Sequence, residues 1–112
     1  MHYLLDAAQR KASRSTCYFE FQKGSFKNRH WLPDSVYLHA DTFDRLGMYD
    51  LFASSIQDFD YYMDTRVSLF QYETLKTNAM LYGGEIAAIF AELDVWVAEC
   101  FKYESCFTIC GI

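Results

Sequence analysis

The clearest periodic pattern in the sequence lies in residues 85–102, where apolar side chains recur every three or four positions. This spacing predicts a helix with one broad apolar face. The face is formed by Ile86, Ile89, Phe90, Leu93, Trp96, Val97, Cys100 and Phe101. Gly83 and Gly84 mark the break before this helix, and Glu85, Glu92 and Glu99 form an acidic line along one flank. A face this broad must be covered by the rest of the chain, which therefore has to supply the other half of a core.

Two shorter segments alternate between apolar and polar residues, which is typical of strands in a half-buried sheet. They are residues 16–21 and residues 35–40. The turn residues Gly24-Ser25 and Pro33-Asp34 lie between them, so we expect an antiparallel pair. The tail from Cys106 to Cys110 alternates as well and predicts a short edge strand.

The remaining segments are mainly helical by pattern. Residues 2–14 predict a short helix, and the segment Asp41-Thr-Phe-Asp44 resembles a helix start capped by Asp41 and ended by Gly47. A further helix is predicted from Met48, because apolar residues follow at helical spacing as Phe52, Ile56, Phe59 and Met63. Residues 66–81 fit a strand and a helix about equally well, and the pattern does not decide between them.

Together these patterns predict an α+β fold in which a small antiparallel sheet packs against two or more helices. The 112 residues are one domain's worth, so we expect a single domain over residues 1–112. Hydrophobic residues make up 52% of the chain, which is enough to exclude a disordered chain. No apolar run approaches the roughly 18–20 residues needed to span a bilayer, so we expect no integral membrane protein.

The net charge of −5 is distributed unevenly along the chain. Residues 1–31 hold six basic and two acidic side chains, a net charge of +4, whereas residues 32–112 hold four basic and thirteen acidic ones, a net charge of −9. An acidic protein repels phosphate backbones, so general nucleic-acid binding is not expected. The same acidity favours encounter with a basic protein partner.

The four cysteines give little indication of a disulfide framework or a metal centre. Cys100, Cys106 and Cys110 are close in sequence but lack the paired C-x2-C spacing of structural zinc sites, and no histidine lies near them in sequence. We therefore expect no metal and no cofactor. No secretory signal is visible at the start of the sequence, which favours a cytoplasmic protein with free thiols. Cys17 would meet His39 only if their two strands pair, so a cysteine–histidine site remains an alternative.

The segment from Asp58 to Asp64 has the most unusual composition in the chain, with three aspartates and three aromatic rings in seven residues. Residues 41–64 as a whole carry six acids against one base, Arg45. Tyrosine supplies a large rigid contact area with a polar tip, and carboxylates complement a surface rich in Lys and Arg. A calcium loop is disfavoured, because the central glycine and distal glutamate of an EF-hand are missing. The sequence thus predicts a partner-binding surface formed by Asp41, Asp44, Asp50, Asp58, Asp60, Tyr61, Tyr62 and Asp64.

These residues give the chain a resemblance to the small, acidic, aromatic-rich immunity proteins of bacterial toxin–immunity systems, including contact-dependent growth inhibition systems. The resemblance implies a cytoplasmic, non-enzymatic protein that neutralises a basic toxin domain, often a nuclease, with its acids standing in for substrate phosphate. It implies nothing about architecture, because such proteins share no common fold. Two other functions stay open: a small enzyme or ligand-binding domain with a Cys/His or carboxylate site, and a structural subunit that self-associates through its aromatic surface.

Overall fold

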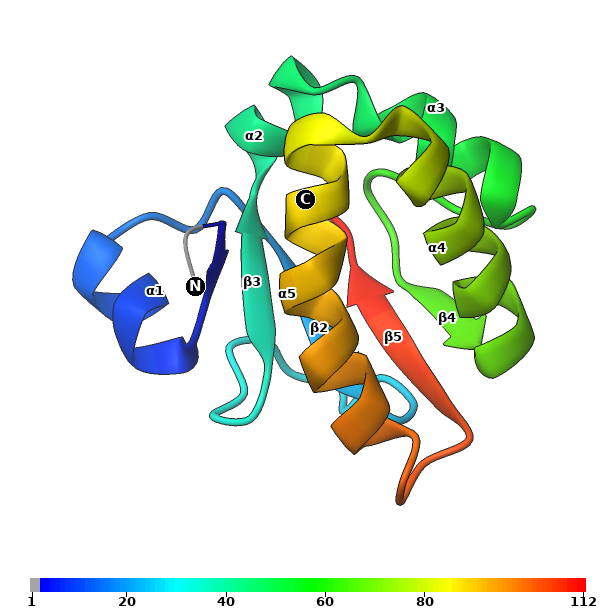
Figure 1. The fold of residues 1–112 in the computed structure, drawn as a ribbon. Coiled ribbons are helices and arrows are strands. Elements are labelled where there is room, and N and C mark those ends of the chain that lie inside the picture. The colour runs from blue at the N-terminus through cyan, green and yellow to red at the C-terminus, as the bar shows by residue number, and fades with distance from the viewer. Residues whose placement is uncertain (1–2) are drawn as a thin grey trace.

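The computed structural model describes residues 3–112 and has the predicted α+β architecture, with five strands and five helices in the described part of the chain. In chain order the elements are β1 (Leu4–Leu5), α1 (Ala7–Ser13), β2 (Tyr18–Lys23), β3 (Val36–His39), α2 (Ala40–Arg45), α3 (Met48–Ser55), β4 (Thr65–Ser68), α4 (Leu69–Tyr82), α5 (Gly84–Cys100) and β5 (Cys106–Cys110). The long helix α5 crosses one face of the sheet, and α2 and α3 lie at one end of it (Figure 1).

The five strands form one antiparallel sheet in the order β1-β3-β2-β5-β4. The predicted pairing of the two alternating segments is confirmed, with Phe19 opposite Leu38. The first of these strands runs further than predicted, because Gln22 pairs with Thr108 of β5, a strand that is distant in sequence. The prediction of an edge strand at the C-terminus is wrong: β5 lies between β2 and β4, since it pairs with both of them.

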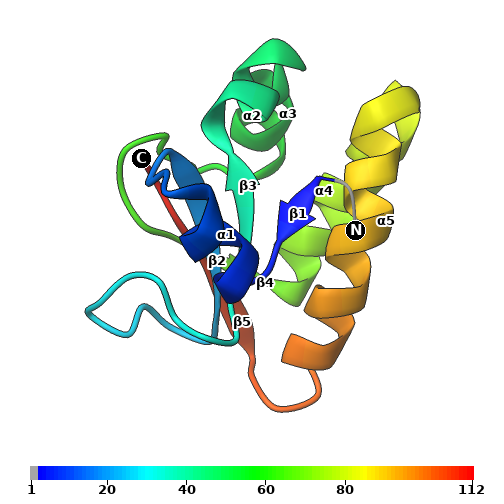
Figure 2. The ribbon, with the colours of Figure 1, turned by 90° about the vertical axis from the view of Figure 1, so that its left-hand side faces the viewer.

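The sheet is covered on both sides rather than on one. Phe19 and Phe21 of β2 are buried, but so are Tyr18, Glu20 and Gln22 on the opposite side of the same strand. The loop of residues 24–35 covers this second side, where the Gln22 side-chain amide donates to the Arg29 carbonyl at 2.8 Å. Figure 2 shows this cyan loop and α5 on opposite sides of the sheet. The alternating pattern therefore predicted the strand correctly but not the burial of its polar side.

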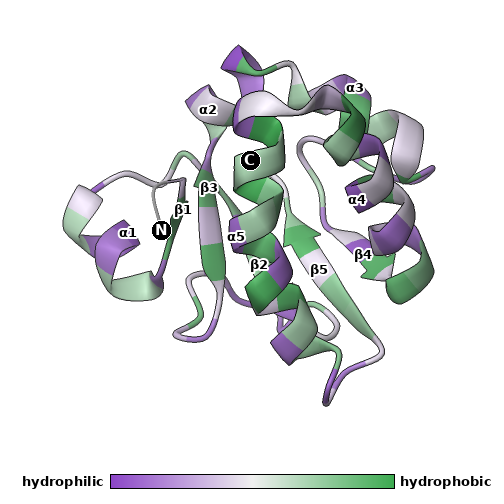
Figure 3. Ribbon diagram, in the orientation of Figure 1, coloured by the Kyte–Doolittle hydropathy of each residue, from purple (hydrophilic) through white to green (hydrophobic). Residues whose placement is uncertain are grey.

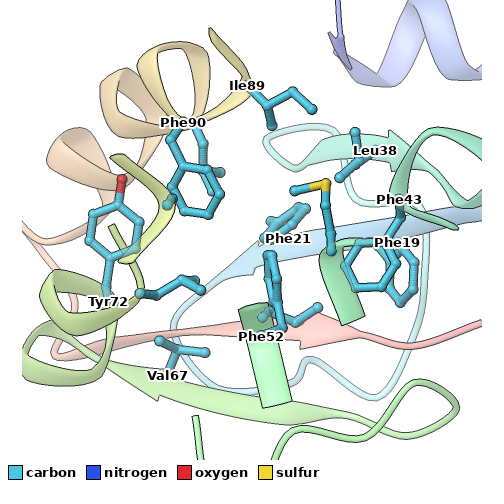
Figure 4. Close-up of a cluster of buried hydrophobic side chains, with 14 of the residues drawn as sticks. Phe19, Phe21, Leu38, Phe43, Phe52, Val67, Tyr72, Ile89 and Phe90 are labelled. Atoms are coloured by element: carbon cyan, nitrogen blue, oxygen red, sulfur yellow. The ribbon is translucent and has the colours of Figure 1, made fainter. Parts of the chain in front are cut away.

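The predicted apolar face of α5 is confirmed for Ile86, Ile89, Phe90, Leu93, Val97 and Cys100, all of which are buried. Trp96 and Phe101 are only partly buried against the core. Figure 4 shows Phe90 and Ile89 reaching from α5 toward the rings that rise from β2, α2 and α3. Apolar residues, green in Figure 3, run along β2, β3 and β5 and recur along α5 between polar ones. The core therefore lies between this helix layer and the sheet.

The acidic line on α5 is not a free solvated surface, because two of its three members, Glu85 and Glu92, bind other parts of the chain. Glu92 accepts hydrogen bonds from the backbone amides of Tyr3 and Leu4, at 3.2 and 3.1 Å. Glu85 accepts from the guanidinium of Arg45 at 2.9 Å. Helix α5 thereby holds both the first strand and the end of α2.

The helix predicted to run from Met48 toward Met63 is too long, since α3 ends at Ser55. Ile56 takes an extended conformation there, with φ −126° and ψ 107°. The residues around this point include serines and an aspartate, which favour turns over helix interiors because their side chains compete for backbone hydrogen bonds. Phe59 is buried beyond the helix end, whereas Met63 is exposed.

Helix α2 forms where it was predicted, but its cap differs. His39 is the capping residue, and its Nδ1 accepts from the Asp41 amide at 3.0 Å, so the prediction of Asp41 as cap is wrong. Gly47 does not simply end this helix. It takes the left-handed conformation at φ +64° that turns the chain directly into α3.

Two further segments divide at a capping residue. The predicted helix over residues 2–14 is divided by Asp6 into β1 and α1, because the Asp6 side chain caps the amide of Gln9; His2 lies outside the described residues. Residues 66–81, which fit a strand and a helix equally well, contain both: Ser68 ends β4 and caps α4 by accepting from Gln71. Within residues 3–112, no helix combines the length and the apolar character needed to cross a membrane.

Candidate functional site

The structure gathers four of the eight predicted binding residues around one hollow on the surface. The hollow has a volume of about 560 Å³ and lies between α2, α3 and the loop that leads into β4. We call it the acidic hollow, and it is lined by Asp44, Tyr49, Phe59, Asp60, Tyr61 and Tyr62. Tyr49 was not predicted as a binding residue, and Phe59 was predicted only as a helix core position. Both belong to the hollow because α3 ends at Ser55 and the chain after it folds back, which brings the Phe59 ring within 5.9 Å of the Tyr49 ring.

Tyr61, like the buried Phe59, joins the acidic hollow to the core. Its ring meets that of Phe19 edge-on, with the ring centroids 5.1 Å apart, and it also packs against Phe43. Its hydroxyl donates to the Asp44 carboxylate, 3.1 Å from each oxygen. Burial and this hydrogen bond raise the pKa of Tyr61, so the phenol stays protonated. The Tyr61 ring is therefore held in place by the core, and its hydroxyl orients the Asp44 carboxylate at the acidic hollow.

The loop that carries Asp60, Tyr61 and Tyr62 is fixed by backbone hydrogen bonds to the C-terminal residues. The Gly111 amide donates to the Met63 carbonyl at 3.2 Å, and the Ile112 amide donates to the Tyr61 carbonyl at 2.8 Å. The approach is so close that a Cβ on Gly111 would collide with the backbone oxygen of Tyr61. The acidic hollow thus has a rigid backbone on this side.

Local bonds around Asp60 complete this wall of the hollow. The Asp60 amide donates to the Thr65 hydroxyl at 3.2 Å, and its carboxylate accepts from the Tyr62 amide at 2.8 Å. The Tyr62 ring, in contrast, is 71% exposed and stands against the ring of Tyr61. An exposed ring on a fixed backbone is available for contact with a partner at little cost in ordering.

The charge of the acidic hollow is not compensated by the one base of the segment. Arg45 forms an ion pair with Glu85 of α5, with a nitrogen–oxygen distance of 2.9 Å. The Glu85 carboxylate raises the pKa of Arg45, and the guanidinium in turn lowers the pKa of Glu85. Asp44 and Asp60 therefore face solvent without a basic side chain among the described residues that line the hollow.

The other four predicted residues are exposed but do not line the hollow. Asp41 lies at the start of α2, 3.8 Å from the His39 ring nitrogen. Asp50 is in the first turn of α3, and Asp58 lies in the turn after it. The Asp64 carboxylate contacts the thiol of Cys110. Of the eight residues predicted to form the binding surface, the structure thus leaves the four that line the acidic hollow.

The cysteines do not form the pairings considered from the sequence. Cys17 is exposed, and within residues 3–112 no hydrogen bond or ion pair joins it to His39, whose ring packs on Tyr18 instead. Cys110 lies near Glu20 and His30, which sequence proximity did not suggest. Burial, together with the charges of Glu20 and Asp64, raises the pKa of the Cys110 thiol to about 12. A thiol so rarely ionised at neutral pH is a poor nucleophile, which argues against Cys110 itself as a catalytic nucleophile.

Comparisons with protein-family models, with curated proteins and with solved structures give no match for this chain. The assignment of a function therefore rests on the geometry and chemistry of the residues themselves.

Proposed function

We propose that this protein is a non-enzymatic binding protein that neutralises a basic protein partner, and that the acidic hollow receives an Arg or Lys side chain of that partner. The resemblance to immunity proteins makes a toxin domain the partner class we favour, and the cytoplasm the expected place of encounter. Under this proposal the carboxylates of the hollow occupy the place that substrate phosphate takes on a nuclease.

One observation carries the proposal: two exposed carboxylates and four aromatic rings surround the same hollow, and none of the described residues that line it is basic. A guanidinium or ammonium group is attracted both to carboxylates and to the faces of aromatic rings. Asp44 and Asp60 supply the first interaction, and the exposed rings of Tyr49 and Tyr62 supply the second. A neutral ligand would lack this attraction between opposite charges, and an acidic ligand would be repelled by Asp44 and Asp60.

Two alternatives lead to different experimental results. The volume of the hollow also falls in the range of small-molecule pockets, so an enzyme or ligand-binding domain would show turnover or binding of a small molecule and no protein partner. A self-associating subunit would use exposed apolar residues such as Phe70 and Leu81 of α4. In that case light scattering would detect an oligomer, and the substitutions Phe70→Ser and Leu81→Ser would convert it to the monomer.

The first experiment identifies the partner. The full chain is tagged and used to capture proteins from a native lysate, and the product of the neighbouring reading frame is tested directly by coexpression. The proposal expects a partner with a basic surface whose toxic activity is suppressed by the complex. Failure to find any protein partner, together with turnover of a small molecule, would reject it.

The second experiment tests the position of the interface with two tyrosines of similar exposure. Tyr62 is 71% exposed at the acidic hollow, and Tyr103 is 80% exposed after the end of α5. If Tyr62 is an anchor of about 2 kcal/mol, Tyr62→Ala speeds dissociation roughly 30-fold, whereas Tyr103→Ala leaves it unchanged. Equal effects of the two substitutions would place the interface elsewhere.

A further inference from the structure

We propose that Glu20, His30 and Cys110 form a binding site for a divalent ion of the zinc type. The site lies on the side of the sheet covered by the loop of residues 24–35, and it is independent of the partner-binding function proposed above. Sequence spacing could not indicate it, because the three residues belong to β2, to this loop and to β5.

The sheet register brings the first two ligands together. Glu20 of β2 is directly opposite Cys110 of β5. Residues directly opposite each other in an antiparallel pair project to the same side of the sheet, with Cβ atoms roughly 4.5–5.5 Å apart. Both residues are about 1% exposed, so the carboxylate and the thiol share one buried face of the sheet.

The covering loop brings the third ligand. The backbone amides of Trp31 and Leu32 donate to Glu20 at 2.9 Å each, which holds the loop against the strand. His30, the residue just before them, has its Nδ1 3.6 Å from Glu20 Oε1. One ligand atom from each of Glu20, His30 and Cys110 lies within 4.8 Å of the other two. Ligand atoms around a tetrahedral zinc are separated by about 3.3–3.8 Å, so a small shift of side chains closes the site.

The donor set suits zinc in chemistry and in charge. Thiolate, imidazole and carboxylate are the three side-chain ligands that zinc uses. A bound ion deprotonates its thiol, and the two negative ligands, both buried, then balance a charge of +2. A cavity of about 170 Å³ lies beside the three residues, bordered by Thr16, Tyr18 and the C-terminal residues among others. It leaves room for water as a fourth ligand.

The surroundings of Glu20 match those of a fixed metal ligand. Glu20 Oε2 accepts from the Leu32 amide and, at 2.7 Å, from the Ser35 hydroxyl. Oε1 accepts from the Trp31 amide, which leaves this oxygen one further acceptor position. Oε1 is also the Glu20 oxygen that lies 3.6 Å from the Nδ1 atom of His30. Hydrogen bonds to a ligating carboxylate orient it for the metal. The competing explanation is that Glu20 only ties the loop to the sheet, and this predicts no affinity for metal.

The test uses the full chain, reduced and freed of metal with a chelator, and titrated with Co²⁺ and Zn²⁺. We expect one equivalent to bind, sulfur-to-cobalt charge-transfer absorption to appear, and the melting temperature to rise with added Zn²⁺. His30→Ala, at an exposed position, should weaken Zn²⁺ binding at least 10-fold. Cys110→Ser should remove the charge-transfer band, and the matched control Cys17→Ser should keep it.

Three results would overturn the site. The first is a dissociation constant for Zn²⁺ weaker than roughly 10 µM in the wild-type chain. The second is unchanged binding in His30→Ala, which decides the matter even if Cys110→Ser does not fold. The third is loss of the charge-transfer band in Cys17→Ser.

Discussion

Two pairs of a tyrosine and a carboxylate lie in different surroundings in this protein. In the buried pair, the Tyr37 hydroxyl lies 3.5 Å from the carboxylate of Glu20 and donates to the Leu32 carbonyl at 2.6 Å. In the exposed pair, the Tyr61 hydroxyl donates to the carboxylate of Asp44 at 3.1 Å. The groups are chemically the same, but the donors around the two carboxylates are not.

The difference separates a structural carboxylate from one that is available to a partner. Glu20 receives two backbone amides and the Ser35 hydroxyl, so in the metal-free protein its charge is stabilised by these three donors. Asp44 is exposed, and among the described residues its side chain has Tyr61 as its hydrogen-bond donor. Its remaining acceptor capacity faces the acidic hollow, where solvent or a cation can take it up.

The largest expected effect is on stability, at the buried pair. Glu20→Ala leaves two backbone amides and a hydroxyl without their acceptor, and each buried unsatisfied group costs about 1–3 kcal/mol. We expect a loss of about 3 kcal/mol or more in urea unfolding with a chelator present. Asp44→Ala, at the exposed pair, should cost under about 1 kcal/mol. A similar small loss for both variants would erase the distinction between the two carboxylates.

The next effect is a fall in stability at alkaline pH. Burial and then the Glu20 charge raise the pKa of Tyr37 to about 12, whereas an unfolded tyrosine ionises near 10. Between these values the folded state binds one more proton than the unfolded state. The free energy of unfolding therefore decreases by about 1 kcal/mol per pH unit from this group. Tyr37→Phe should make the stability profile between pH 10 and 12 less steep, and an unchanged slope would contradict the assignment.

A smaller effect is expected at the C-terminal support of the hollow. Gly111→Ala places a methyl group against the backbone of residues 61–63, which can yield only by moving the loop. Overpacking of this kind costs about 1–3 kcal/mol. We expect a loss of that size in denaturant unfolding and weaker partner binding, while Ile112→Ala, which keeps its backbone hydrogen bond, should change both much less. Normal partner binding by Gly111→Ala would show that the hollow does not need this support.

The fold was largely predictable from the sequence because its main elements follow simple periodicity. The α5 face and the pairing of β2 with β3 were found this way. The central place of β5 was not, because its partners are at least 38 residues distant and its alternation resembles that of an edge strand. The burial of Glu20 was hidden for a related reason. Alternation indicates which side of a strand is polar, but not that a loop will cover it.

The candidate site was predictable in composition but not in shape. The clustering of aspartates and tyrosines marked residues 41–64, and four of the predicted residues do meet at one hollow. The identity of these four residues depends on two features: α3 ends at Ser55, and the loop that carries Asp60, Tyr61 and Tyr62 contacts Gly111. Both arise from tertiary packing, which no local pattern expresses.

The most direct test of the central claim compares two double variants with equal changes in charge. Asp44→Asn with Asp60→Asn alters the acidic hollow, and Asp50→Asn with Asp58→Asn alters the same segment outside it. Each is mixed with the captured basic partner at low salt, where charges act over roughly 10 Å, and the association and dissociation rates are measured. We predict that the hollow variant binds at least about 10-fold more weakly and that the control changes less than about 3-fold. Equal losses, or no loss in the hollow variant with its fold intact, would contradict the claim that the hollow receives the partner.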